Sequence, residues 1–189
     1  MTQSQQLHMT VYASLFAALI AAGAYLAIPI GPVPIVLQNL FVMLAGLLLG
    51  CRWGLAAVGV YLLAGALGLP VFAGGAGGIG RILGPTGGYL IGYLPVVFLI
   101  GFIAERSKGR IPFDVLAMIC GTVVLYACGV SWLKVVTGME WSKAMAAGMT
   151  PFLPGDVLKI IAAVPIAKTL RPVIQGKFQD TGADAYSRG

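Results

Sequence analysis

The sequence predicts an all-α integral membrane protein, a single domain of residues 1–189 built as a bundle of six transmembrane helices. Of its 189 residues, 59% are hydrophobic and only 10% are charged, whereas soluble domains average about 25% charged residues. The apolar residues form six runs, several of which approach the roughly 17–25 residues that a spanning helix needs. Most of the basic residues lie in short polar joints between these runs.

The six apolar runs define the predicted helices in order. We place them near residues 11–30, 33–50, 55–69, 89–104, 115–136 and 151–170. The first run ends at Pro29 and Gly31, and the polar break Cys51–Gly54 separates the second from the third. The third and fourth runs are short for a span, so we expect their helices to extend into the Gly-rich sequence beside them.

The basic residues predict the orientation of the bundle. With six spans both termini share one side, and eight of the 12 Lys and Arg residues fall on that side. These eight are Arg52, Arg106, Lys108, Arg110, Lys168, Arg171, Lys177 and Arg188. Because such residues concentrate on the cytoplasmic side of membranes, both termini are predicted to be cytoplasmic. The net charge of +6 therefore describes topology and does not indicate nucleic-acid binding.

The connection between the third and fourth runs is rich in glycine and is predicted to be external. Nine glycines lie from Gly68 to Gly88, together with large apolar residues such as Phe72. Irregular backbone at membrane depth is tolerated where it is buried or lines a cavity. We therefore expect a loop folded back over the bundle, and a flexible connector is the alternative. The G-x-G-x-x-G string at 75–80 lacks the strand–helix context and the following acid of a dinucleotide site.

Asp156 and Lys159 are the most informative candidate site residues, because they lie in the apolar sixth run near its external end. Each charge within a span costs roughly 2.5–3.5 kcal/mol. Residues three apart share one helix face, and Pro154 and Gly155 before them suit a helix start. The pair suits a ligand with both donor and acceptor atoms, since a carboxylate accepts and an ammonium donates. A self-satisfied ion pair is the alternative.

Three further polar residues are predicted near the same external end. Gln38 is a candidate ligand group in the second run, although a hydrogen bond between helices is an equally simple role. Tyr89 begins the fourth run one turn before Tyr93, and both also suit the aromatic belt at a membrane interface. Arg81 in the Gly-rich loop is suited to an acidic ligand or to snorkelling toward the interface.

Small residues recur at helical spacing in the first run, at Ala13, Ala17 and Ala21. In lipid, small residues allow another helix to approach closely. The stripe predicts either packing inside the bundle or a docking face for another membrane subunit.

Catalysis and metal binding receive little support from the sequence. The single histidine, His8, lies in the polar N-terminal segment, and the acidic residues form no pair within one run. Clusters of metal-ligating residues and a G-x-x-x-x-G-K-[ST] phosphate loop are both absent from the sequence. We therefore expect a protein that is not an enzyme and carries no cofactor.

Five strings, in order and at the right spacing, resemble the BioY family, the biotin-specific S components of energy-coupling-factor (ECF) transporters. They are GPVPIVLQ at 31–38, GLPVFAGGAGG at 68–78, GPTGGYLIGY at 84–93, GVSWL at 129–133 and FLPGDVLK at 152–159. The resemblance covers essentially the whole chain. It implies a multi-pass protein of a prokaryotic cell membrane that captures biotin from outside. The implied partners are a transmembrane T component and ATP-binding-cassette ATPase subunits, with the first helix as the docking surface.

The resemblance also implies roles for the candidate residues. Asp156 and Lys159 match the family's binding pair and would meet the ureido head of biotin, while Gln38 and Tyr89 match pocket positions. Phe72 is a candidate to pack on the rings of the vitamin. Some relatives have a ligand-contacting Asn in the loop, but here the stretch 77–80 has no amide side chain and Arg81 follows it. An autonomous proton-coupled vitamin transporter using Asp156 is the alternative function.

Overall fold

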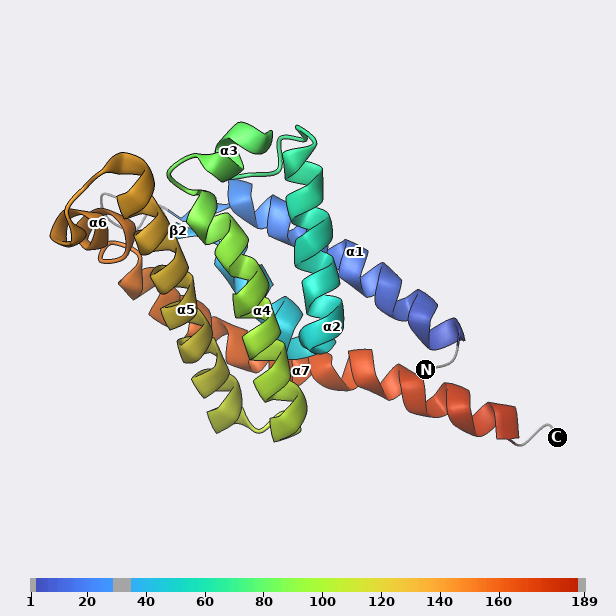
Figure 1. Cartoon of the computed structure of the whole chain (residues 1–189). Coiled ribbons are helices and arrows are strands. Elements are labelled where there is room, and N and C mark those ends of the chain that lie inside the picture. Colours follow the sequence, from blue (N-terminus) through green and yellow to red (C-terminus); the bar gives the residue numbers. More distant parts are fainter. Residues whose placement is uncertain (1–2, 29–34, 187–189) are drawn as a thin grey trace.

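The computed structural model describes residues 3–28 and 35–186, which form seven helices and one pair of short strands (Figure 1). The elements are α1 (Gln3–Tyr25), β1 (Ala27–Ile28), β2 (Ile35–Val36), α2 (Gln38–Ala66), α3 (Ile79–Leu83), α4 (Gly87–Ser107), α5 (Ile111–Thr137), α6 (Trp141–Gly148) and α7 (Leu153–Tyr186). The helical fold class is therefore as the sequence predicts.

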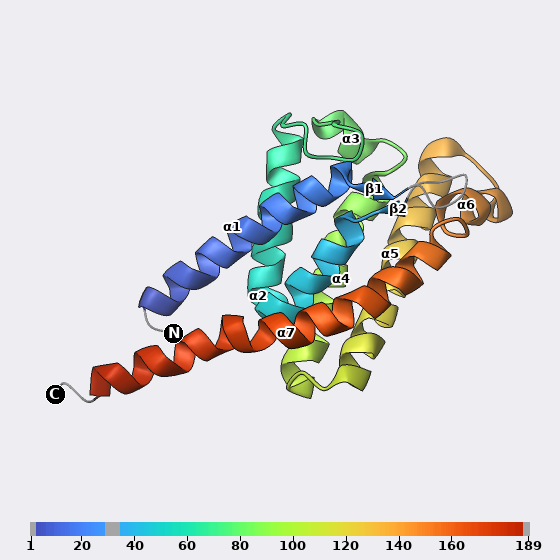
Figure 2. The same cartoon turned by 180° about the vertical axis from the view of Figure 1, so that it is seen from behind.

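Four of the helices, α1, α2, α4 and α5, are long and apolar enough to cross a membrane. Helix α2 packs on α1, α4 and α7, and α4 packs on α5. Seen from behind, α1 and α7 lie on one face of the molecule and pass in front of α2 and α4 (Figure 2). The buried apolar side chains of α1, α2, α4, α5 and α7 join in one core.

Each of the six predicted runs contains helix, but the second and third belong to one hydrogen-bonded element, α2, which turns sharply at Gly50. Gly50 has φ 78° and ψ −175°, a conformation that L residues rarely adopt. The two parts of α2 diverge from this turn toward the same end of the molecule (Figures 1 and 2). The break therefore falls at Gly50, and the predicted position at Cys51–Gly54 is wrong because these residues are already helical.

Helix α4 stabilises the Gly50 turn from the side. The backbone N–H of Cys51 donates to Glu105 Oε1 at 2.9 Å, and its thiol contacts Oε2 at 3.2 Å. A carboxylate suits the N–H groups that are left free where the second part of α2 begins. Gly101 allows this approach, since a Cβ there would lie 2.3 Å from the Cys51 nitrogen.

The connections contain structure that the sequence analysis did not predict. Helix α3 forms in the Gly-rich loop, and α6 forms between α5 and α7. The first helix ends at Tyr25, earlier than expected, and is followed by the antiparallel pairs Ala27 with Val36 and Ile28 with Ile35. The predicted connection at residues 31–34 lies outside the described residues.

An ion pair between Arg171 and Asp114 joins three helices at the end of the bundle remote from α3. Both Arg171 guanidinium Nη atoms donate to the Asp114 carboxylate, at 2.9 and 3.1 Å. One of them also donates to the Leu47 carbonyl at 3.2 Å, close to where the first part of α2 ends. Three helices, α2, α5 and α7, are thus joined around the buried Asp114.

Candidate functional site

A cavity of about 510 Å³ lies at the α3 end of the bundle; we call it the main cavity. Residues from β2, α2, the Gly-rich loop, α4, α5, α6 and α7 all contribute to its wall. Its volume falls within the 300–1,000 Å³ typical of small-molecule sites. Five of the predicted ligand-binding residues line it: Gln38, Phe72, Arg81, Tyr89 and Lys159.

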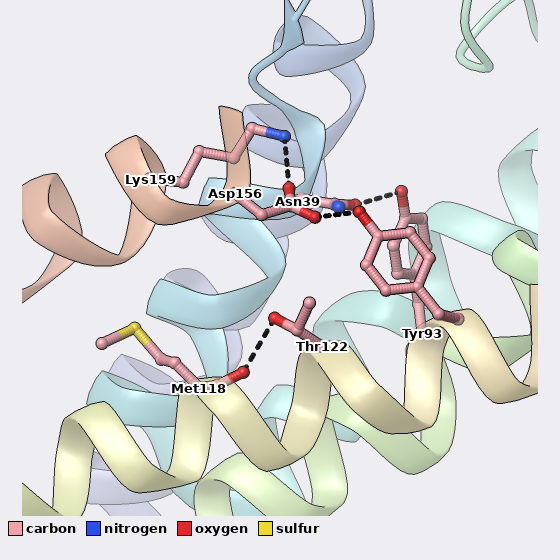
Figure 3. Close-up of polar contacts among 7 residues, drawn as sticks. Asn39, Tyr93, Met118, Thr122, Asp156 and Lys159 are labelled. Atoms are coloured by element: carbon pink, nitrogen blue, oxygen red, sulfur yellow. Dashed lines mark hydrogen bonds and ion pairs between the residues drawn. The ribbon is translucent and has the colours of Figure 1, made fainter. Parts of the chain in front are cut away.

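Asp156 and Lys159 form a buried ion pair on the first turns of α7 (Figure 3). Lys159 Nζ lies 3.0 Å from Asp156 Oδ1, and the two residues are only 6% and 2% exposed. Asp156 Oδ2 accepts a further hydrogen bond from the Tyr126 hydroxyl of α5. The carboxylate is therefore held on both oxygens by groups of the protein.

Asp156 and Lys159 line two different hollows of the structure. Lys159 lines the main cavity, whereas Asp156 lines a separate groove between α5 and α7, behind Lys159 and Tyr126. An ammonium has three N–H donors, of which Asp156 takes one. Asp156 therefore holds the Lys159 ammonium at the wall of the main cavity. The ion pair, which is the alternative to a ligand site, is present, and ligand contact by either residue stays a prediction.

Two amide side chains stand next to each other at the start of α2. Gln38 Nε2 donates to the Tyr61 hydroxyl at 2.7 Å, which joins the two parts of α2 across the turn. The Tyr93 hydroxyl of α4 donates to Asn39 Oδ1 at 2.6 Å (Figure 3). Gln38, Asn39 and Tyr93 all line the main cavity. Gln38 therefore forms a hydrogen bond within the protein, which is the alternative role given above, and it also lines the cavity.

Tyr89 closes the side of the main cavity next to α6. Its hydroxyl donates to the Gly148 carbonyl at 2.8 Å. Its ring packs so closely on α5 that a Cβ at Gly129 would lie 2.2 Å from it. The position of Tyr89 therefore depends on two glycines, and the tyrosine is fixed before any ligand arrives.

The Gly-rich loop folds back over the bundle, as the sequence predicts (Figure 1). Phe72 is only 1% exposed and meets the Tyr61 ring edge-on, with centroids 5.6 Å apart. Further along the chain, the Trp132 indole of α5 donates to the Gly84 carbonyl at 3.0 Å. Arg81 lies on α3, exposed to solvent on one side and lining the main cavity on the other.

The small residues of α1 are divided between the core and the surface. Ala13 and Ala17 are 4% and 7% exposed within the chain's own bundle, and Ala21 is half-buried. Ala18 and Ala22 are exposed. A partner that docks on α1 would thus meet Ala18 and Ala22 before the predicted Ala13 and Ala17. Docking itself stays a prediction.

Asn39 and Tyr126 are cavity residues that the sequence analysis did not single out. Asn39 had a usable signal, because it is a second amide beside Gln38 in an apolar run. Tyr126 had none, since its partner Asp156 is 30 residues away and only the packing of α5 on α7 joins them. Among the described residues, no group of three or more His, Cys, Asp or Glu could hold a metal ion.

Buried charges and paired amides around a cavity at one end of an apolar helical bundle define a membrane-embedded binding protein. The chain belongs to the BioY family, whose sequence model matches residues 1–176. It is 44% identical over 158 residues to the "Probable biotin transporter BioY" of Pyrococcus horikoshii, covering 84% of this chain and 93% of that protein. It is 41% identical over 161 residues to the "Biotin transporter BioY" of Thermotoga maritima, covering 85% and 94%.

A solved structure has the same fold. It is described as the "S-component for biotin from an ECF-type ABC transporter". The TM-score is 0.82 and the sequences are 36% identical, with 90% of this chain and 94% of the other covered.

Proposed function

We propose that the chain binds biotin from the external side of the cell membrane, as the S component of an ECF-type vitamin uptake transporter. The observation that carries the proposal is the main cavity, in which a buried ammonium and two amides face apolar and aromatic walls. The names of its relatives as biotin transporters and the match to a biotin S-component support the same function. The role is binding and transport, without chemical conversion of the vitamin.

The chemistry of biotin fits the groups around the main cavity. Its ureido head offers one carbonyl and two N–H groups, and its fused rings are otherwise apolar. Lys159 is placed to donate to the ureido carbonyl, and the amide of Gln38 can accept or donate beside it. Phe72, which lines the cavity, would contact the apolar part. Arg81, the cation of α3, is suited to the carboxylate at the end of the vitamin's side chain.

Calorimetric titration of the purified chain with biotin tests the proposal. The parent protein is expected to bind, and the double variant Asp156→Asn/Lys159→Met is expected to bind at least tenfold more weakly, since a hydrogen bond to a charged group contributes about 1.5–3 kcal/mol. Absence of binding by the parent protein would overturn the function. Undiminished binding by the double variant would overturn the site.

The membrane placement belongs to the same proposal. Counting α2 as two crossings gives six, with both termini cytoplasmic and the main cavity facing outward. Single cysteines at Arg81 and Lys108 provide the test in whole cells, on a variant whose native cysteines are replaced by alanine. A membrane-impermeant maleimide should label Arg81→Cys in intact cells and Lys108→Cys only after lysis. The reverse pattern would contradict the orientation.

The proposed partners are a transmembrane T component, which would dock on the α1 side, and two ATP-binding-cassette ATPase subunits, which couple to the T component. The alternative, a proton-coupled transporter working alone, predicts that vesicles holding only this chain accumulate biotin and stop when an uncoupler is added. ATP-dependent uptake that requires the partner subunits would support the S-component role.

A further inference from the structure

A second hollow, the α5–α7 groove, lies between the middle of α5 and the N-terminal end of α7. It has a volume of about 470 Å³ and is lined mainly by apolar side chains, including Ile119, Val123, Val130, Trp141, Met145 and Val157. It shares one residue with the main cavity, Tyr126. It is therefore a separate site, and the proposed biotin function does not use it.

The groove opens sideways, where the proposed placement puts hydrocarbon. The side chains along its rim are exposed although they are apolar: Val123 is 63% exposed, Val157 55% and Trp141 54%. Such an apolar hollow binds water poorly, because a bound water molecule needs two to four polar partners. The lining thus selects a flexible apolar occupant.

A cation stands at one end of the apolar lining. Tyr126, Val130 and Lys134 follow one another at intervals of four residues, so they share one face of α5. The Lys134 ammonium lies 5.3 Å from the centroid of the Trp141 ring, which lines the groove. The occupant should therefore carry negative charge at this end.

The dimensions match one leaflet of a membrane. On α5 the rise from Val123, which lines the groove, to Lys134 is ~16 Å at 1.5 Å per residue. One leaflet provides ~15 Å of hydrocarbon, half of a ~30 Å core. An acyl chain that reaches Val123 would thus leave its headgroup at the level of Lys134 and Trp141.

An occupant of the groove would lie against the hydrogen bond between Tyr126 and Asp156. The two residues form part of the inner wall of the groove, and their hydrogen bond separates the groove from the main cavity. A hydrocarbon chain on the outer side keeps water away from that hydrogen bond. Electrostatic contacts are stronger where water is excluded.

We infer that the α5–α7 groove binds one acyl chain of an anionic phospholipid, whose headgroup lies at Lys134. The inference rests on the membrane placement in the proposed function. It adds a lipid site that backs the charged wall of the main cavity.

Photolabelling in nanodiscs tests the inference on the full chain. Discs contain phosphatidylcholine with a small fraction of phosphatidylglycerol that carries a diazirine on one acyl chain. After irradiation, mass spectrometry should locate label on Val123 and Val157 at least threefold above Val60 and Leu63, which are 50% and 65% exposed on α2. Even labelling of these four positions would overturn the inference.

Variants separate the groove from the headgroup site. Val123→Trp should fill the groove and reduce its labelling at least threefold, whereas the control Leu63→Trp should not. Lys134→Met should lower the preference for labelled phosphatidylglycerol over labelled phosphatidylcholine about fivefold, the ratio that corresponds to about 1 kcal/mol for a basic residue near anionic lipid. An unchanged preference, or crosslinks of this surface to a second copy of the chain in place of lipid, would overturn the inference.

Biotin titration of the same samples keeps the two proposals apart. If the parent protein binds biotin but its groove is not labelled selectively, the lipid site is wrong and the proposed function stands. If the groove is labelled but biotin does not bind, the lipid site stands and the proposed function fails.

Discussion

Removing the Lys159 ammonium should damage stability and ligand binding by separate routes. In Lys159→Met, Asp156 stays buried, at 2% exposure, but loses the ammonium that lies 3.0 Å from its Oδ1. Breaking a buried ion pair by removing one partner typically costs about 3–5 kcal/mol, because the other charge remains without compensation. Adding Asp156→Asn removes that charge and should restore most of the lost free energy of unfolding.

Binding should not recover in the same way. The double variant still lacks the donor that faces the main cavity, so its affinity for biotin should stay about 10–150-fold below that of the parent, the range for a hydrogen bond worth 1.5–3 kcal/mol. The free energy of unfolding is measured by denaturant titration in detergent micelles, and affinity by calorimetry. The exposed Lys143 on α6 supplies the matched control, Lys143→Met, which should change neither quantity.

Two outcomes would refute this reasoning. If Lys159→Met were as stable as the parent, the carboxylate would not depend on the ammonium. If Asp156→Asn/Lys159→Met recovered affinity together with stability, Lys159 would act only through the fold and would not be a ligand group.

Further predictions concern the Gly-rich loop and the end of the bundle remote from α3. Gly65→Ala should displace Phe72, since a Cβ at residue 65 would lie 2.1 Å from the Phe72 ring, and calorimetry should show weaker biotin binding. The control Gly59→Ala, whose Cβ would meet nothing within 4 Å, should bind biotin like the parent protein. Equal affinities of the two variants would contradict a role for the position of Phe72. Arg171→Met leaves the buried Asp114 unpaired and should lower the free energy of unfolding by about 3 kcal/mol, as measured by denaturant titration. Adding Asp114→Asn should restore this stability. A loss of stability that persists in the double variant would contradict the charge argument.

The sequence predicted the features that depend on local pattern. Apolar runs and their polar joints predicted the helices, because burial in lipid requires continuous apolar sequence. The cost of placing Asp156 and Lys159 in such a run indicated that they have polar partners, and the two side chains pair with each other at the wall of the main cavity. The many glycines and apolar residues of the loop predicted that it packs on the bundle, which the burial of Phe72 confirms.

The features that were missed depend on residues far apart in the sequence. The turn of α2 falls at Gly50 because Glu105, on another helix, accepts the N–H of the next residue; composition alone placed the break within the polar residues that follow. Tyr126 lies in an unremarkable apolar run, and its contact with Asp156 exists only once α5 and α7 are packed. That Lys159 lines the main cavity while Asp156 lines the α5–α7 groove likewise depends on how α7 packs on α5.

The most direct test of the account is a crystal structure of the purified protein grown with biotin. We expect the fused rings of the vitamin in the main cavity, with a ureido atom within hydrogen-bond distance of Lys159 Nζ and the Gly-rich loop above it. Biotin bound in the α5–α7 groove, or in the main cavity but out of reach of Lys159, would contradict it.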